Sequence, residues 1–82
     1  MKRFDLCIVQ NTNSIYDKAF AFILDEDVEN FYHVEIWKFK NNEGADLDYI
    51  LKTDLRLATE EEIKEYQTKF KEYCHRNENP QL

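Results

Sequence analysis

An alternating segment in the second half of the chain limits the fold more than any other feature. From position 47 to position 57, every second residue is apolar or a threonine, and charged residues fill most of the positions between them. This period of two is typical of a β-strand with one side facing a core. We therefore expect one long strand over residues 47–57, with these side chains on its core side: Leu47, Tyr49, Leu51, Thr53, Leu55 and Leu57.

A helix is predicted immediately after this strand. Thr59 and Glu62 match a capping box, in which the threonine hydroxyl accepts from the N–H of residue 62 and the glutamate accepts from the N–H of residue 59. The helix is expected over about residues 60–76, and residues 77–82 are expected to fray. One side of it carries an apolar stripe at helical spacing: Ile63, Tyr66, Phe70, Tyr73 and Cys74.

Three further strands are predicted before position 47. Apolar residues alternate over residues 3–9, and residues 31–40 are rich in the aromatic and β-branched side chains that favour strands. Residues 18–24 are also predicted as a strand, although a helix capped by Ser14 fits the spacing of the apolar residues there as well.

Two short polar segments connect these strands. Residues 25–30 and 41–45 are short enough to make each connection an antiparallel hairpin. The second segment contains Gly44, the only glycine of the chain, which suits a turn position of positive φ. The chain is thus expected to run up and down through neighbouring strands before the helix.

These elements predict a two-layer α+β fold, in which an antiparallel sheet of about four strands carries one C-terminal helix packed on one face. At 82 residues, the chain is expected to form a single compact domain over residues 1–82. Because the strand over 47–57 and the helix stripe have matching lengths, we expect Leu51, Leu55, Ile63 and Phe70 to meet in the core.

The alternation also assigns the strand residues to two faces. The face expected beneath the helix consists of Phe4, Leu6, Ile8, Phe20, Phe22, Leu24, Val34, Ile36, Leu51, Leu55 and Leu57. The opposite face is expected to carry Cys7, Val9, Ala19, Ala21, Ile23, Phe31, His33, Glu35, Trp37, Phe39 and Ile50.

This second face is half apolar, whereas a solvated face should be mostly polar. It is therefore a candidate interface for a partner or a second copy, and its expected binding residues are Phe31, His33, Glu35, Trp37 and Phe39. The alternative is strong curvature of the sheet, which would pack these side chains internally.

Acidic residues are concentrated in the predicted turns. The chain has 17 acidic and 11 basic residues, so its formal net charge of −6 repels nucleic-acid phosphates and favours a basic partner. Acidic residues at the helix start have a local explanation, because negative charge stabilises a helix N-terminus. Those of the first hairpin turn have no such explanation, and we expect them to contribute to a site for a basic protein: Asp25, Glu26, Asp27 and Glu29.

No catalytic, cofactor or metal site is predicted. The two cysteines and two histidines lack the spacing of metal ligands, and the acidic turn lacks the glycine and glutamate positions of a calcium loop. A single glycine cannot build a phosphate loop, and Ser14, the sole serine, lies in no nucleophile elbow. His33 and Glu35 are the one conceivable acid–base pair.

The sequence therefore favours a non-enzymatic binding protein: an adaptor or inhibitor of a larger protein, or a homodimer. In composition it is similar to small accessory proteins of bacteria and their phages that act by binding a host enzyme. Reduced cysteines and the lack of a signal peptide or long apolar run predict a cytoplasmic location. The alternative is a single-stranded nucleic-acid binder that stacks bases on Phe31, Trp37 and Phe39.

Overall fold

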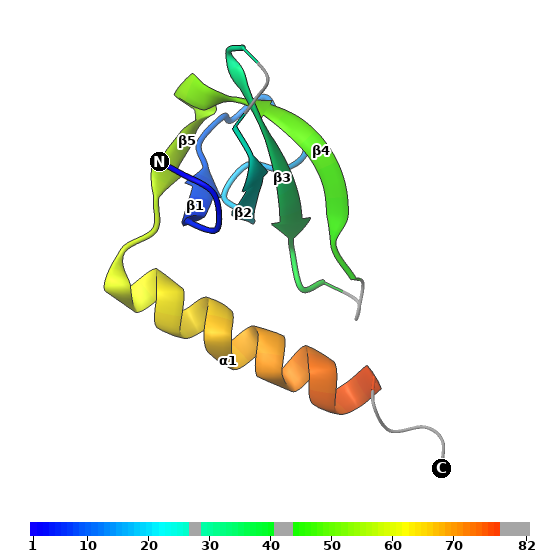
Figure 1. Ribbon diagram of the computed structural model, residues 1–82. Coiled ribbons are helices and arrows are strands. Elements are labelled where there is room, and N and C mark those ends of the chain that lie inside the picture. The colour runs from blue at the N-terminus through cyan, green and yellow to red at the C-terminus, as the bar shows by residue number, and fades with distance from the viewer. Residues whose placement is uncertain (27–28, 41–43, 78–82) are drawn as a thin grey trace.

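A computed structural model describes residues 1–26, 29–40 and 44–77 and confirms the α+β class. The elements in chain order are β1 (Leu6–Val9), β2 (Phe20–Asp25), β3 (Phe31–Trp37), β4 (Asp46–Leu51), the 3₁₀ turn η1 (Lys52–Asp54), β5 (Leu55–Leu57) and α1 (Glu60–Asn77) (Figure 1). The sheet has five strands instead of about four. Residues 18–24 contribute to strand β2, so the strand interpretation of that segment is confirmed.

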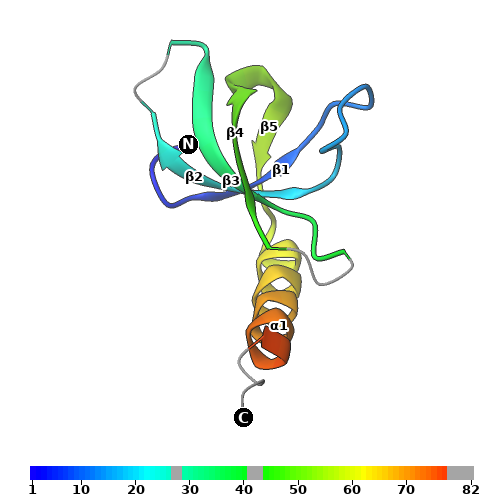
Figure 2. The same ribbon diagram turned by 90° about the vertical axis from the view of Figure 1, so that its right-hand side faces the viewer.

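The sheet is antiparallel throughout, and its two edge strands are consecutive in the chain. The strand order is β4-β3-β2-β1-β5, so β4 and β5 lie at opposite edges although only η1 separates them in the sequence. The sheet must curl strongly for so short a turn to join its edges, and Figures 1 and 2 show this curl above α1. The curl gives the sheet an inner, concave face and an outer, convex face.

The prediction of one strand over residues 47–57 is wrong because η1 interrupts it. Lys52 donates its N–H to the carbonyl of Asn30 at 2.9 Å, and Gln10 donates its N–H to the carbonyl of Asp54 at 2.7 Å. These bonds tie the turn to two other segments. The odd-numbered leucines before and after the turn therefore lie on opposite faces of the sheet. Leu51 is 41% exposed on the outer face, whereas Leu55 pairs with Val9 and is buried on the inner face.

The inner face forms the main core. Its buried residues come from all five strands and from the end of the segment that precedes β2: Cys7, Val9, Ala19, Ala21, Ile23, Tyr32, Val34, Ile36, Ile50 and Leu55. Most of these side chains are small or β-branched, which suits a narrow space enclosed by a curled sheet. Met1 closes part of this core, since its sulfur lies 3.6 Å from Cys7 Sγ and its carbonyl accepts from the Tyr32 hydroxyl at 3.2 Å.

The predicted division of β3 between the two faces is wrong by one position. The register pairs Phe22 with Glu35 and Ile23 with Val34. Glu35 therefore lies on the outer face with Phe22, and Val34 lies inside with Ile23. A shift by one residue moves every side chain of a strand to the other face. The register also shifts between Ile23 and Asp25, as in a β-bulge, which strict alternation of the sequence does not reveal.

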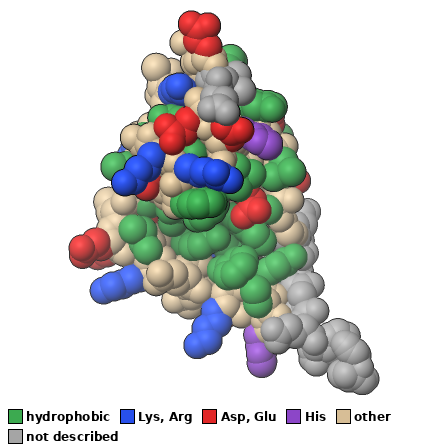
Figure 3. Space-filling view, in the orientation of Figure 1, with side chains coloured by type: hydrophobic (Ala, Val, Ile, Leu, Met, Phe, Trp, Pro, Cys, Tyr) green, Lys and Arg blue, Asp and Glu red, His purple; other side chains and the backbone are tan. Residues whose placement is uncertain are grey.

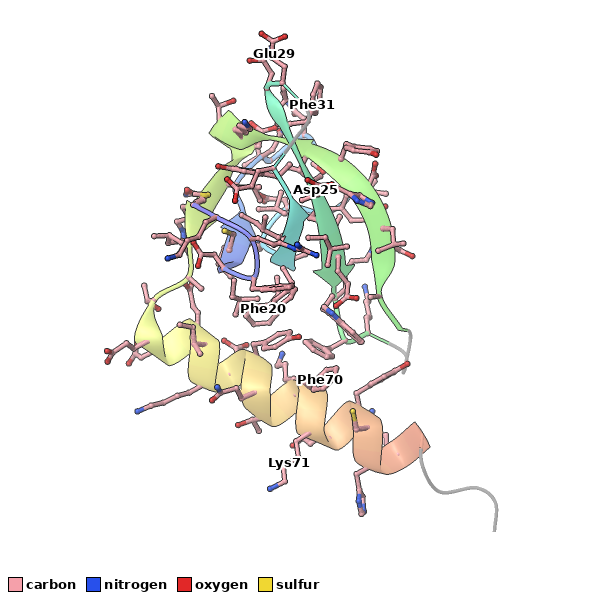
Figure 4. All side chains as sticks on the ribbon, viewed as in Figure 1. Phe20, Asp25, Glu29, Phe31, Phe70 and Lys71 are labelled. Atoms are coloured by element: carbon pink, nitrogen blue, oxygen red, sulfur yellow. The ribbon has the colours of Figure 1, made fainter. Side chains whose placement is uncertain are left out.

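A second, aromatic cluster joins the outer face to α1. Its buried members are Ile8, Phe20 and Trp37, and Tyr66 and Tyr73 of α1 pack against them. The Trp37 ring centroid lies 5.2 Å from those of both Phe70 and Tyr73, and its Nε1 donates to Glu35 Oε1 at 2.8 Å. Figure 4 shows Phe20 and Phe70 pointing toward each other from the sheet and the helix.

The expectation that Leu51, Leu55, Ile63 and Phe70 meet in one core is consequently wrong. Leu55 belongs to the inner core, Leu51 is exposed on the outer face, and Phe70 packs against Trp37. The helix stripe is the packing side of α1, as predicted, but the strand residues that it covers come from β1, β2 and β3.

The capping box at the start of α1 is confirmed. Thr59 donates its N–H to Glu62 Oε1 at 2.8 Å, and Glu62 donates its N–H to Thr59 Oγ1 at 3.2 Å. Arg56 of β5 adds a bidentate pair, with both guanidinium nitrogens 2.7 Å from the Glu62 carboxylate oxygens. Glu62 thus connects the last strand to the first turn of the helix.

Gly44 does not occupy a positive-φ position, contrary to expectation; such angles occur instead at Phe4, Lys18, Asn30 and Phe39. The position is tight, because a Cβ atom there would lie 3.0 Å from the Tyr73 hydroxyl oxygen and the Tyr73 side chain would have to shift slightly. The connection between β3 and β4 therefore approaches α1 closely at this point.

Replacing Trp37 tests the aromatic cluster. Trp37→Ala should lower the free energy of unfolding by about 3–5 kcal/mol, because it empties a buried site between sheet and helix. Leu47→Ala is the matched control: Leu47 is 64% exposed, and a surface truncation should change stability by no more than about 0.5 kcal/mol. Urea denaturation of both variants measures the difference, and equal midpoints would show that α1 is not docked on Trp37.

The Glu62 contacts make stability depend on pH. The Arg56 guanidinium, followed by the Thr59 N–H, lowers the pKa of Glu62 from 4.5 to about 2. A lowered pKa in the folded state stabilises the fold at pH values above 4.5, and this contribution is lost as the pH falls toward about 2. Glu62→Gln should remove that part of the pH dependence, while Glu61→Gln should retain it. Urea titrations across this pH range measure both slopes.

Candidate protein-binding face

Helix α1 covers only part of the outer face of the sheet. The uncovered part carries the outer residues of β3 and β4, which pair as Phe31 with Leu51, His33 with Tyr49 and Glu35 with Leu47. Phe22 of β2 continues this surface, and Phe4 lies against Phe22 with ring centroids 5.9 Å apart. We call this surface the open face and define it by Phe4, Phe22, Phe31, His33, Glu35, Leu47, Tyr49 and Leu51.

The open face exposes large apolar side chains. Phe4 is 61% exposed, Leu47 64%, Tyr49 51% and Leu51 41%, and the other four residues of the face are half-buried. In the orientation of Figure 3, hydrophobic side chains gather over the front of the molecule between the curled sheet and α1. Phe70 of α1, 36% exposed, extends the apolar surface onto the helix. The outer side of the sheet therefore keeps an aromatic surface in contact with water.

Phe4 is held in an unusual backbone conformation. Its φ is 71°, in the left-handed region that bulky residues rarely adopt. Its N–H donates to the carbonyl of Ile23 at 2.7 Å, and the Asp5 carbonyl accepts from the Ile23 N–H at 3.0 Å. These bonds keep Phe4 beside β2 and its ring on the outer face. A strained conformation that presents an exposed aromatic ring is a feature that clusters at functional sites.

His33 and Glu35, the one conceivable acid–base pair of the sequence, each contact a different aromatic residue. The His33 ring stacks on Tyr49 with centroids 4.7 Å apart, and the Glu35 carboxylate accepts from Trp37 Nε1. Both side chains thus fix neighbouring aromatic rings of the outer face. Their geometry supports a packed surface and shows no proton-transfer pair.

Acidic residues border the open face at the end of the β2–β3 hairpin. Asp25 pairs with His33 across the strands, and Glu29 lies at the tip of the hairpin above Phe31 (Figure 4). The Glu26 carboxylate accepts from the Arg3 N–H at 2.9 Å, and the Arg3 guanidinium lies 4.9 Å from the Phe4 ring centroid. Asp27, also predicted for this group, lies outside the described residues.

Two of the predicted binding residues are placed elsewhere. Trp37 is only 7% exposed, and Phe39 packs between Trp37 and Tyr66, with centroid distances of 5.2 and 5.7 Å. Trp37 shares the outer face of β3 with Phe31, but α1 covers Trp37 and Phe39, so these two rings do not belong to the exposed surface. Trp37 is thus buried, but beneath α1 and not through the curvature of the sheet that the alternative invoked.

Five members of the open face are absent from the binding residues predicted from the sequence: Phe4, Phe22, Leu47, Tyr49 and Leu51. The prediction placed three of them on the face beneath the helix. It placed Leu47 and Tyr49 on the core side of one long strand. One signal was available. A single helix covers one stripe of a sheet, and the apolar residues on both faces exceed what that stripe can bury.

A groove of about 900 Å³ lies between the sheet and the start of α1. Its lining mixes both charges, and two of its lining residues, Arg56 and Glu62, are bonded to each other. Within the described residues, no cluster of side chains is suited to hold a metal ion. Burial raises the pKa of the Cys7 thiol to about 11, so this sulfur is protonated at neutral pH. The groove and the core thiol thus offer no activated nucleophile.

No protein family, curated protein or solved structure matches this chain. In the part of the chain that the structure describes, no helix is long and apolar enough to span a membrane.

Substitutions at Phe4 test the strain. Phe4→Asn should leave the free energy of unfolding unchanged or raise it, because asparagine tolerates left-handed φ and relief of about 1–3 kcal/mol of strain offsets the lost ring contact. Phe4→Val, the matched control, also removes the ring but adds a β-branched side chain that is disfavoured at this φ. It should be the less stable variant in urea denaturation, and the reverse order would contradict strain at Phe4.

Proposed function

We propose that this protein is a non-enzymatic binding module, an adaptor or inhibitor that attaches to a larger protein through its open face. The observation that carries the proposal is the contiguous set of exposed apolar side chains, with Phe4, Leu47 and Tyr49 each more than half exposed. Large exposed apolar patches on small proteins mark interaction sites, and aromatic residues are favoured anchors in them. In accord with its composition, the protein would be an accessory factor of bacterial or phage origin acting in the cytoplasm.

The charge distribution supports a partner of defined chemistry. Asp25, Glu26 and Glu29 gather at the hairpin end of the open face, Glu35 lies within it, and the chain has a net charge of −6. A partner with an apolar patch and a basic flank would match both parts of this surface. Such complementarity accelerates association and excludes acidic competitors.

An enzymatic role has less support from the side chains. His33 stacks on Tyr49, Glu35 is bonded to Trp37, and the Cys7 thiol is buried and protonated. These groups are engaged in packing or held inactive.

The nucleic-acid alternative also has less support. Its stacking surface requires Trp37 and Phe39, which lie beneath α1. The remaining ring, Phe31, follows the acidic end of the β2–β3 hairpin, where phosphates would be repelled. Single-stranded nucleic acid would need to displace α1 before it reached Trp37 and Phe39.

Affinity capture with a surface control tests the proposal. Immobilised wild-type protein and a Leu47→Ser/Tyr49→Ser variant are exposed to bacterial lysate, and bound proteins are quantified by mass spectrometry. Loss of two anchors should reduce capture of a specific partner by about 30-fold or more, since hot-spot truncations cost about 2 kcal/mol or more. Ile15→Ser is the control, because Ile15 is 77% exposed but lies between β1 and β2, outside the open face. Equal capture by all three proteins would contradict the proposal.

A further inference from the structure

Strand β4 is the long edge of the curled sheet. Of the strands that the structure describes, only β4 and β5 have a neighbour on one side alone, and β5 spans only Leu55–Leu57. Very short edge strands resist further pairing. β4 spans Asp46–Leu51 and pairs with β3 from Ile36 to Phe31 without a register shift. It is the edge that could accept another strand.

Of the usual protections of a sheet edge, β4 has only inward-pointing charges, Asp46 and Asp48, which disfavour pairing with an acidic strand. Lysines, prolines and bulges commonly prevent edge strands from pairing. The sequence of β4, Asp-Leu-Asp-Tyr-Ile-Leu, contains no lysine or proline. Its Tyr49 N–H is bound locally, to Asp48 Oδ1 at 2.7 Å. Such side-chain bonds substitute for strand pairing, so a carbonyl of an added strand could replace this carboxylate.

The side chains of β4 define what could lie beside it. Leu47, Tyr49 and Leu51 project on the outer face, whereas Asp46 and Asp48 project on the inner side. In an antiparallel pair, directly opposite side chains on one face interact, and opposite charges there are stabilising. A strand added to β4 would therefore need apolar residues on one side and cationic residues on the other.

The surroundings of the two aspartates are consistent with this requirement. Both lie close to Tyr16, where burial first and then the Asp48 and Asp46 carboxylates raise the pKa of the phenol. One cation is already near, since Lys38 Nζ lies 5.6 Å from the Tyr16 ring centroid. Asp46 is exposed and Asp48 is half-buried, so neither aspartate is enclosed in the core.

We infer that β4 binds an extended segment of the partner protein, in which apolar residues alternate with lysine or arginine, as an additional strand of the sheet. This inference rests on the proposed function and names how the partner attaches. The apolar residues of that segment would extend the open face beyond Leu47, Tyr49 and Leu51, and its basic residues would face Asp46 and Asp48. Main-chain hydrogen bonds supply affinity in strand addition, and alternate side chains supply specificity.

A second copy of the chain fits this edge less well. Pairing two β4 strands would bring Asp46 and Asp48 of both copies to the same side of the joined sheet. Each copy also carries a net charge of −6. Like charges directly opposite each other are destabilising, so a basic segment is the better match.

Peptide binding followed by NMR tests the inference. The isotope-labelled full chain is titrated with a short peptide that alternates valine and lysine. Backbone amides of residues 46–51 should shift and become protected from hydrogen exchange. A peptide that alternates valine and glutamate, and the valine–lysine peptide N-methylated at alternate amides, should each bind at least about tenfold more weakly, through charge repulsion and lost backbone bonds respectively.

A charge reversal on the protein supplies the matched variant. Asp46→Lys/Asp48→Lys should exchange the preference and bind the valine–glutamate peptide more tightly. If this variant does not fold, Asp46→Asn, at the exposed position, should weaken binding of the valine–lysine peptide while leaving the spectrum folded.

Three results would overturn the inference. They are equal binding of the two charge patterns, undiminished binding of the N-methylated peptide, and a concentration-dependent dimer whose residue 46–51 amides are protected without peptide. If β4 fails to bind the peptide but Leu47→Ser/Tyr49→Ser still abolishes partner capture, strand addition is excluded and the proposed function stands. If the peptide binds β4 but wild type and the Leu47→Ser/Tyr49→Ser variant capture partners equally, the proposed function fails instead.

Discussion

The short connection between β4 and β5 constrains the rest of the structure. Because η1 joins two strands at opposite edges of one sheet, the sheet must curl until those edges approach each other. Backbone hydrogen bonds from Lys52 to Asn30 and from Gln10 to Asp54 hold η1 in place. The curl encloses the inner core, whose buried residues come from the five strands and from Ala19, with none from α1. Helix α1 packs on the outer, convex face of the sheet. Because the helix is straight and the sheet is curved, part of this face bends away from the helix (Figure 2).

That mismatch between a curved sheet and a straight helix explains both the aromatic cluster and the open face. Close to the helix, aromatic side chains fill the space between the sheet and α1: Phe20 and Trp37 from the sheet, and Tyr66, Phe70 and Tyr73 from the helix. Farther away, β4 leaves the reach of the helix and its Leu47, Tyr49 and Leu51 remain exposed. The surface proposed for binding is therefore a direct result of how the sheet curls.

Local features of the sequence predicted much of the fold. The capping box at Thr59 placed the start of α1, and the spacing of Tyr66, Phe70 and Tyr73 identified its packing side. Both hairpins, β2–β3 and β3–β4, also follow from the positions of the polar segments between β-prone stretches. These features depend on residues close together in the chain, where propensity and side-chain chemistry decide the conformation.

The faces of the sheet could not be predicted in the same way, because they depend on register. The shift near Ile23 reversed the assignment of Val34 and Trp37, and η1 reversed that of Leu55 relative to Leu51. Alternation in a sequence shows which residues of one strand share a face. It does not reveal a bulged residue or a turn that changes how that strand is aligned with the next one. The open face consequently shares Phe31, His33 and Glu35 of β3 with the face predicted from the sequence, but its other members lie on neighbouring segments that the prediction assigned elsewhere.

The pairing of β1 with β5 has a consequence for how the chain folds. Cys7 pairs with Leu57, so the last strand of the sheet joins the first across most of the chain. The β2–β3 and β3–β4 hairpins require only local loop closure, whereas β1–β5 pairing must await a contact distant in sequence, and such contacts slow folding. During synthesis, residues 55–57 also leave the ribosome long after β1. The thiol of Cys7 therefore stays uncovered on one side until the final strand arrives.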